Sequence, residues 1–192
     1  MELKDVAHVG EWLRSAIGVP FVVVGGSAIE RVVPVATKDV DVLIDGSDWD
    51  AVDSAIESRK DAAPLEPTGG SIRGTVVTIG FAQIDLEILS DEPFSGRSGP
   101  GSFTQYVREQ ESVVHEGIRY ATPAAVFYMR LNAPDDWRLY LPAIERDIES
   151  GVTPETLDDA VKIAEHFGVG PTVRGRVEAL RATRSALDLR RE

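Results

Sequence analysis

The sequence contains no cysteine among its 192 residues. This absence excludes a disulfide framework, a thiolate nucleophile and any zinc or iron–sulfur site with cysteine ligands. Long apolar runs are also missing, since the longest strongly apolar stretch, Val19–Val24, is far too short to cross a bilayer. The first residues lack the basic and then apolar pattern of a secretory signal. We therefore expect a cytoplasmic protein without membrane contact, in which any metal is held by oxygen or imidazole.

Positive charge is scarce, because 20 Lys and Arg residues stand against 32 Asp and Glu residues and give a net charge of −12. This balance argues against broad nonspecific attraction to nucleic acid or anionic lipid. The deficit is uneven, since Thr172–Glu192 carries six arginines and only three acidic residues. An acidic body with an arginine-rich end can still bind a polyanion or a partner protein locally.

A segment rich in Ser, Gly and Pro, Ser90–Ser102, marks the best domain boundary. Before it the hydrophobic pattern alternates between helices and strands, and after it the pattern is mainly helical. We therefore expect an α/β (α+β) protein with a small mixed sheet flanked by helices in residues 1–95 and a mainly helical domain in residues 103–192.

The expected elements follow the hydrophobic period. In the first part, strands are predicted at Phe21–Val24, Asp39–Asp45, Ile72–Ile79 and Ala82–Leu89, and helices at Leu3–Ile17, Ser27–Val33 and Ser47–Arg59. In the second part, a hairpin is predicted within Ser112–Ala121, and helices at Thr122–Asn132, Asp135–Glu149, Thr153–Phe167 and from Pro171 onward. The alternation in Ala82–Leu89 predicts an apolar face and an acidic face that carries Asp85 and Glu87.

Two carboxylates at i and i+2 of one predicted strand, Asp39 and Asp41, are the first candidates for catalysis and metal binding. They face the same way about 6–7 Å apart and can converge on one metal ion or on a pair. Carboxylates suit hard cations such as Mg²⁺, with Mn²⁺ as an alternative. We expect a third acid from a neighbouring strand, with Asp85 favoured and Glu87 as the alternate.

A glycine pair, Gly25 and Gly26, stands directly after the first buried strand, and Ser27 follows it twelve residues before Asp39. The glycines allow backbone N–H groups to approach a triphosphate, and Ser27 adds a hydroxyl donor. In a two-metal arrangement one ion activates the attacking hydroxyl and the other stabilises the leaving pyrophosphate. Thr37 and Lys38 flank the acids, so both are candidates for nucleotide binding.

The combination of Val24-Gly25-Gly26-Ser27 with Asp39-Val40-Asp41 resembles the signature of the DNA polymerase β-type nucleotidyltransferase superfamily. The resemblance covers about residues 19–89. It implies a nucleotidyltransferase core that transfers a nucleoside monophosphate from a nucleoside triphosphate.

Two further phrases, Thr37–Leu43 and Ala121-Thr122-Pro123 with Met129–Ala133, resemble the AbiEii and MenT type toxins of toxin–antitoxin systems. This resemblance implies the 3′ end of tRNA as acceptor, a consequent block of translation, and a cognate antitoxin protein as partner. Those toxins usually carry a lysine where this chain has Arg130. Arginine binds phosphate bidentately but is not a readily deprotonated base, so the resemblance implies phosphate binding for Arg130.

Two other functions remain open from the sequence. The same centre can modify a protein hydroxyl or a small molecule such as an aminoglycoside, and an acidic protein favours a cationic substrate. A degenerate module that binds a nucleotide without catalysis is the non-enzymatic alternative. The retention of Asp39, Asp41 and Asp85 counts against that module, because buried carboxylates without a role cost stability.

Overall fold

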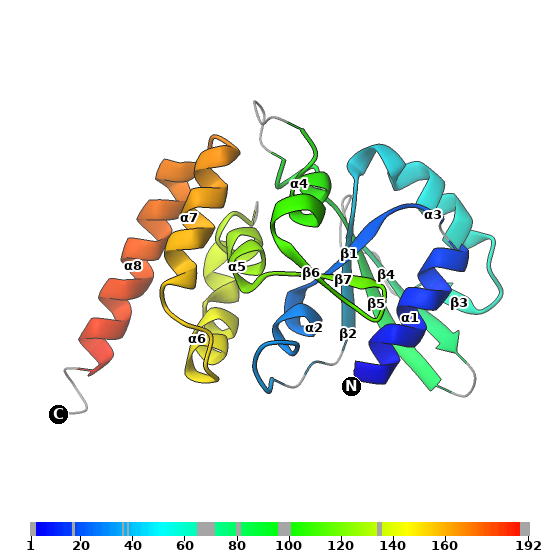
Figure 1. Cartoon of the computed structure of the whole chain (residues 1–192), viewed down its shortest axis with the longest axis horizontal. Coiled ribbons are helices and arrows are strands. Elements are labelled where there is room, and N and C mark those ends of the chain that lie inside the picture. The colour runs from blue at the N-terminus through cyan, green and yellow to red at the C-terminus, as the bar shows by residue number, and fades with distance from the viewer. Residues whose placement is uncertain are drawn as a thin grey trace.

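The computed structural model describes residues 3–16, 18–35, 37, 39–64, 72–79, 82–95, 101–133 and 136–188 (Figure 1). Its α-helices are α1 (Leu3–Ala16), α2 (Gly25–Ile29), α3 (Trp49–Glu57), α4 (Phe103–Gln110), α5 (Pro123–Leu131), α6 (Leu141–Glu149), α7 (Thr156–His166) and α8 (Gly170–Asp188). Its strands are β1 (Phe21–Val24), β2 (Asp39–Ile44), β3 (Ala62–Pro64), β4 (Ile72–Ile79), β5 (Ala82–Ser90), β6 (Ser112–His115) and β7 (Ile118–Ala121), and short 3-10 turns cover Gly46–Asp48 and Trp137–Tyr140.

The strands form one mixed sheet of seven strands in the order β3-β4-β5-β2-β1-β7-β6. Strand β2 is antiparallel to β1 and parallel to β5. The fold class predicted from the sequence, a mixed α/β sheet flanked by helices, is confirmed. Strand β7 lies beyond the expected domain boundary and pairs in parallel with β1, with Val23 opposite Tyr120. The sheet therefore draws strands from both predicted parts of the chain.

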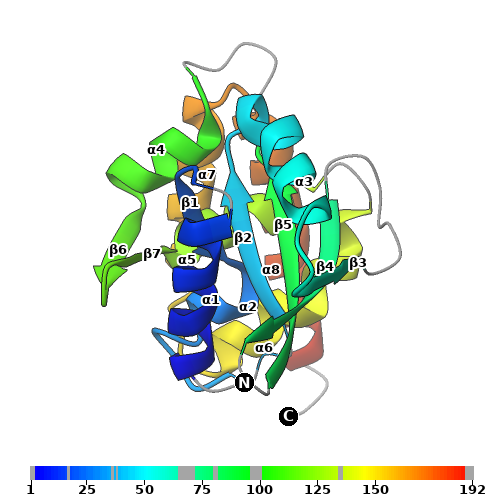
Figure 2. The ribbon, with the colours of Figure 1, turned by 90° about the vertical axis from the view of Figure 1, so that its right-hand side faces the viewer.

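Helices cover both faces of the sheet and bury a separate core on each (Figures 1 and 2). In Figure 2, α1 and α3 lie in front of the sheet, and they pack over the face that carries Val40, Val42 and Ile44. The helices from α5 to α8 pack on the opposite face, against Leu43 and β1 residues such as Val24. Because side chains alternate along β2, Asp39 and Asp41 share the face of Leu43. The acidic residues therefore point toward the C-terminal helices.

A buried carboxylate joins the two sides of the predicted boundary. Asp91, just after β5, accepts hydrogen bonds from the backbone N–H of Gly46 at 2.8 Å and of Thr104 at 2.8 Å, and from the Ser102 hydroxyl at 2.5 Å. Ser102 also caps α4 by accepting from the Gln105 N–H. Helix α4 and strand β3 are elements that the sequence pattern did not predict. The Asp91 contacts fix the start of α4 against the sheet.

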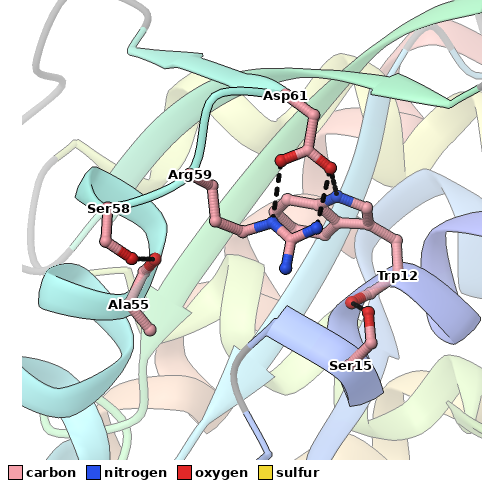
Figure 3. Close-up of polar contacts among 6 residues, drawn as sticks. All are labelled: Trp12, Ser15, Ala55, Ser58, Arg59 and Asp61. Atoms are coloured by element: carbon pink, nitrogen blue, oxygen red, sulfur yellow. Dashed lines mark hydrogen bonds and ion pairs between the residues drawn. The ribbon is translucent and has the colours of Figure 1, made fainter.

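A polar cluster on the other side of the sheet connects α1 with the segment after α3 (Figure 3). The indole N–H of Trp12 donates to Asp61 Oδ2 at 2.8 Å, and the Arg59 Nε and Nη2 donate to the two carboxylate oxygens of Asp61 at 2.8 Å each. The Arg59 guanidinium also lies over the Trp12 ring, 5.0 Å from its centre. These contacts hold the pKa of Asp61 well below its usual range. The negative charge of Asp61 is therefore balanced within the fold by Arg59.

Within the part of the chain that the structure describes, no helix is both long enough and apolar enough to span a bilayer.

Candidate active site

The strand register places four carboxylates side by side on one face of the sheet. Asp39 of β2 lies opposite Asp85 of β5, and Asp41 lies opposite Glu87. All four residues share the face that looks toward the C-terminal helices, because their neighbours Val40, Leu86 and Ile88 are buried on the other face. Asp85 is exposed, whereas Asp41 and Glu87 are partly buried. The parallel pairing of β2 with β5, which the sequence could not specify, therefore aligns the predicted acids.

The glycine pair lies against Asp41. Val24, the last residue of β1, is opposite Asp41 in the sheet, and Gly25 follows with φ of +60°. A Cβ placed on Gly25 would lie 1.7 Å from Asp41 Oδ2, a distance at which no atom fits. The site therefore requires glycine at position 25 for two reasons: the left-handed backbone favours it and the carboxylate occupies the space of a side chain. The predicted association of the glycines with the Asp-x-Asp pair has a direct structural basis.

The electrostatic environment of Asp41 raises its pKa to about 7. Burial is the largest cause, followed by the negative charges of Asp39 and Glu87, while Arg130 and a hydrogen bond from the Gly26 N–H act in the opposite direction. The pKa of Glu87 is also raised, by burial and then by the charges of Asp39 and Asp85. Like charges at close range disfavour ionisation of a carboxyl group. The cluster therefore has an excess of negative charge that a bound cation would neutralise.

Ser27 and Thr37 are buried residues that contact the backbone around the glycine turn and the start of β2. Ser27 is fully buried, and its hydroxyl donates to the backbone carbonyl of Asp39 at 2.9 Å, which ties α2 to the start of β2. Thr37 is also buried, and its hydroxyl donates to Glu30 at 3.2 Å. A Cβ on Gly26 would lie 2.5 Å from the Thr37 methyl carbon, so Thr37 packs directly on the glycine turn. Lys38, the other predicted nucleotide-binding residue, lies outside the described residues.

Arg130 reaches the site from the last turn of α5. Its side chain is buried and forms an ion pair with Asp147 of α6, with 2.5 Å between Nη1 and Oδ2. Its positive charge is close enough to Asp41 to lower the pKa of that carboxyl. The resemblance to toxins had suggested this arginine for phosphate binding, and the structure places it between the acidic sheet face and α6.

Asp147 is the residue that the sequence analysis missed. It is fully buried, and its second oxygen accepts from Arg146 Nε at 3.0 Å and from Arg146 Nη2 at 2.7 Å. A signal was present in the sequence, because Asp147 stands three residues after Ile144 and directly before Ile148, on the apolar stripe of a helix. A carboxylate on that stripe indicates a buried charge with a specific partner.

The carboxylates fit a hard divalent cation by chemistry, since all the candidate ligands are oxygens. Among the described residues, no three His, Asp or Glu side chains are already gathered around one point in a group able to hold a metal ion. The register sets Asp39, Asp41 and their β5 neighbours at adjacent positions on one face of the sheet. A cation would be held by Asp39 and Asp41 together with Asp85 or Glu87.

Comparison with known proteins gives likenesses in structure only. No protein-family model matches the chain, and no curated protein matches it. Among solved structures, an antigenic nucleotidyltransferase-like protein from Paracoccidioides brasiliensis is 14% identical, with 90% of this chain and 92% of that chain covered and a TM-score of 0.49.

Two other solved structures align over nearly the whole chain. ANT(2″)-Ia in complex with adenylyl-2″-tobramycin is 15% identical, with 96% and 98% of the two chains covered and a TM-score of 0.43. JHP933 from Helicobacter pylori is 14% identical, with 99% and 97% covered and a TM-score of 0.40. At these identities and TM-scores the likeness concerns overall shape, and the function proposed below rests on the residues of the site.

Proposed function

We propose that this protein is a Mg²⁺-dependent nucleotidyltransferase that transfers a nucleoside monophosphate from a nucleoside triphosphate to an acceptor hydroxyl. The observation that carries the proposal is the acidic cluster itself: Asp39 and Asp41 face Asp85 and Glu87, and the pKa of Asp41 is raised to about 7 beside a glycine turn. An excess of negative charge of this kind destabilises the folded protein unless a cationic ligand neutralises it. The arrangement fits the signature that the sequence resembles.

Each group has a defined task in the proposed reaction. The acceptor oxygen forms a bond to the α-phosphorus, the bond from that phosphorus to the bridging oxygen breaks, and pyrophosphate leaves. When bound, Mg²⁺ supplies charge neutralisation for the triphosphate and for the attacking oxygen. Asp39, Asp41 and a β5 carboxylate hold that charge in place, and the acceptor proton passes to a carboxylate of the cluster or to water. Gly25 and Gly26 let the backbone approach the phosphates, and Arg130 binds a phosphate oxygen.

The acceptor in this proposal is RNA, and the expected site of transfer is the 3′ end of tRNA. The resemblance of Thr37–Leu43 and Met129–Ala133 to AbiEii and MenT toxins supports this choice, as well as a toxin role and an antitoxin partner. Basic and aromatic groups beyond α5 support it independently. The guanidiniums of Arg138 and Arg176 each lie over the Trp137 ring, at 5.6 and 5.7 Å from its centre. Trp137 itself is partly buried against the helical core, and arginine beside an aromatic ring is a common combination for binding single-stranded nucleic acid.

The test of this proposal is label transfer from α-labelled ATP, CTP, GTP and UTP, each with Mg²⁺ and total RNA. We expect label in RNA of tRNA size with one preferred nucleotide, and no label with Asp41→Asn. The matched control is Asp61→Asn, which removes an aspartate charge from the cluster with Arg59 and Trp12 and leaves the site intact. Equal labelling by wild type and Asp41→Asn would overturn the proposal.

Other acceptors are separate outcomes of the same assay. The net charge of −12 favours a cationic small molecule if RNA is not labelled, so aminoglycosides and total protein are added as alternative acceptors. Label in either of these would keep the transferase and replace the RNA acceptor. Absence of transfer to every acceptor, together with absence of Mg²⁺-dependent thermal stabilisation by the four nucleotides, would favour a non-catalytic module.

A further inference from the structure

Arg130 lies between two groups of negative charge. On one side, its Nη1 pairs with the fully buried carboxylate of Asp147. On the other side, α5 packs on the sheet face of Val24 and Leu43, the face that also carries the four carboxylates. A guanidinium carries five N–H donors, so an ion pair through one nitrogen is compatible with binding of a second anion.

The carboxylate cluster is a strong competitor for this arginine. Two carboxylates of β2 and two of β5 face the side of the sheet from which Arg130 approaches. A guanidinium free to choose its geometry would pair with these acids directly, because bidentate arginine–carboxylate pairs are among the strongest polar contacts in proteins. It would then neutralise the acids and take the space that a cation and a triphosphate need.

The contacts of Asp147 oppose direct pairing of Arg130 with the acids of the sheet. It is completely buried in α6, and its two oxygens are divided between two arginines: Oδ2 accepts from Arg130 and Oδ1 accepts from Arg146. Arg146 is about half exposed, whereas Arg130 is nearly covered. The buried Arg130–Asp147 contact therefore fixes the Arg130 guanidinium, and the half-exposed contact with Arg146 contributes little to this.

We propose that Asp147 is a positioning residue that holds the Arg130 guanidinium away from the Asp39–Asp41 cluster and directs it toward the phosphates of the bound nucleotide. The inference rests on the proposed nucleotidyltransferase function and adds a residue that the sequence analysis did not assign. In this arrangement α6 contributes to nucleotide binding without touching the nucleotide.

The experiment measures binding of inorganic triphosphate with Mg²⁺ by calorimetry, because this probe reports phosphate contacts and is independent of base preference. Wild type, Asp147→Asn, Arg130→Met and the double variant form a cycle, and Arg146→Gln is the matched control. We expect Asp147→Asn and Arg130→Met each to weaken binding by about tenfold or more. We expect Asp147→Asn to have no further effect in the Arg130→Met background, because Asp147 acts through Arg130. Arg146→Gln should stay within about twofold of wild type, since its guanidinium is about half exposed and screened by solvent.

A second variant and a second readout separate positioning from a loss of folding. Asp147→Glu keeps the buried charge but moves the carboxylate by one methylene, so it should stay folded with a moderately lower unfolding temperature and should still weaken triphosphate binding. Binding of Mg²⁺ alone should also weaken in Asp147→Asn, as the released arginine pairs with the acids, and should recover in the double variant. Equal triphosphate binding by wild type and folded Asp147→Asn or Asp147→Glu overturns the positioning role while the transferase proposal stands. Absence of binding by wild type to triphosphate and to all four nucleotides overturns both.

Discussion

Asp61 and Asp41 show how the same side chain is used in two opposite ways on the two sides of one sheet. Asp61 accepts hydrogen bonds from Arg59 and from the Trp12 indole, and these partners lower its pKa. Asp41 has carboxylates as its nearest charged neighbours in the sheet, and its pKa is raised to about 7. Both residues are aspartates at strand or loop positions close to the sheet, so their chemistry differs only through their surroundings.

The difference indicates which carboxylate serves the fold and which serves a ligand. Asp61 has its countercharge within the chain, and its ion pair is complete without any further group. Asp41 has an excess of negative charge around it, which weakens the folded state unless a cation from solution binds. A perturbed pKa with like-charged neighbours is therefore a stronger indication of a functional site than an ion pair of good geometry.

The largest expected effect is that of Asp41→Asn on catalysis. Removal of one charge from the cluster should lower the proposed nucleotide transfer by about 1,000-fold or more, because a bound Mg²⁺ would lose one of its ligands. The same substitution should raise the unfolding temperature in metal-free buffer, since it removes repulsion from Asp39 and Glu87. Initial rates of label transfer and thermal unfolding with and without Mg²⁺ provide the two measurements. A variant that loses activity and stability together would show that Asp41 belongs with the structural carboxylates.

The next largest effect is expected for Gly25→Ala. The new Cβ would meet Asp41 Oδ2 at 1.7 Å and displace the carboxylate, so transfer should fall by about 100-fold. Gly18→Ala is the matched control, because Gly18 has nearly the same φ, +64°, and a Cβ added there would have no atom within 4 Å. Both variants carry similar backbone strain of about 1 kcal/mol, and only Gly25→Ala disturbs the acids. Similar losses of activity in the two variants would assign the effect to strain instead of contact with Asp41.

The two aspartates should also give opposite pH dependences of stability. The pKa of Asp41 is raised on folding, so the stability that its protonated form contributes is present below about pH 4 and is lost as the pH rises toward 7. The pKa of Asp61 is lowered on folding, so its stabilisation is present above its ordinary value and is lost as the pH falls.

Urea unfolding from pH 3 to 8 in the presence of a chelator tests this contrast. The free energy of unfolding of wild type relative to Asp41→Asn should decrease by about 3 kcal/mol between pH 4 and 7. Relative to Asp61→Asn, it should increase over the acidic end of the range. If both differences in the free energy of unfolding changed with pH in the same direction, the opposite pKa shifts of Asp41 and Asp61 would be contradicted.

The smallest effect is expected for Asp61→Asn, which should leave nucleotide transfer unchanged. Its ion pair with Arg59 is about one-third exposed, so screening limits the loss of stability to about 1 kcal/mol. Differential scanning calorimetry gives the stability and the label-transfer assay gives the rate. A decrease in transfer without a decrease in stability would mean that the cluster of Asp61 with Trp12 and Arg59 is energetically coupled to the candidate active site.

Local pattern was sufficient to predict most of the elements and the sheet faces on which the candidate acids lie. The continuous run Phe21–Val24 and the alternation in Ala82–Leu89 each correspond to a strand, and the alternation placed Asp85 and Glu87 on the polar face. Asp39 and Asp41 were expected to face the same way, and Val40 and Val42 are buried on the opposite face as that requires.

Pairing between segments that are distant in the sequence could not be predicted from local pattern. Nothing in the period of β2 and β5 states that they run parallel with Asp39 opposite Asp85 and Asp41 opposite Glu87, so Asp85 was favoured over Glu87 without knowledge of this register. The same limit applies to Asp147, which lies seventeen residues from Arg130 in the sequence and meets it only in the folded chain. The short strand β3 has three residues and depends on β4 for its hydrogen bonds, so it carries almost no local signal.

The parallel pairing of β1 with β7 has a consequence for the order in which the protein is made. When the first 95 residues have left the ribosome, β1 has β2 beside it but its other edge is bare, and all four residues of β1 are apolar. An uncovered apolar edge is prone to wrong association. At about 5–20 residues per second, β7 follows on the order of seconds later, and Arg130 and Asp147 later still. Until its second half emerges, the nascent chain therefore lacks both the strand that pairs with the free edge of β1 and the buried pair of Arg130 with Asp147.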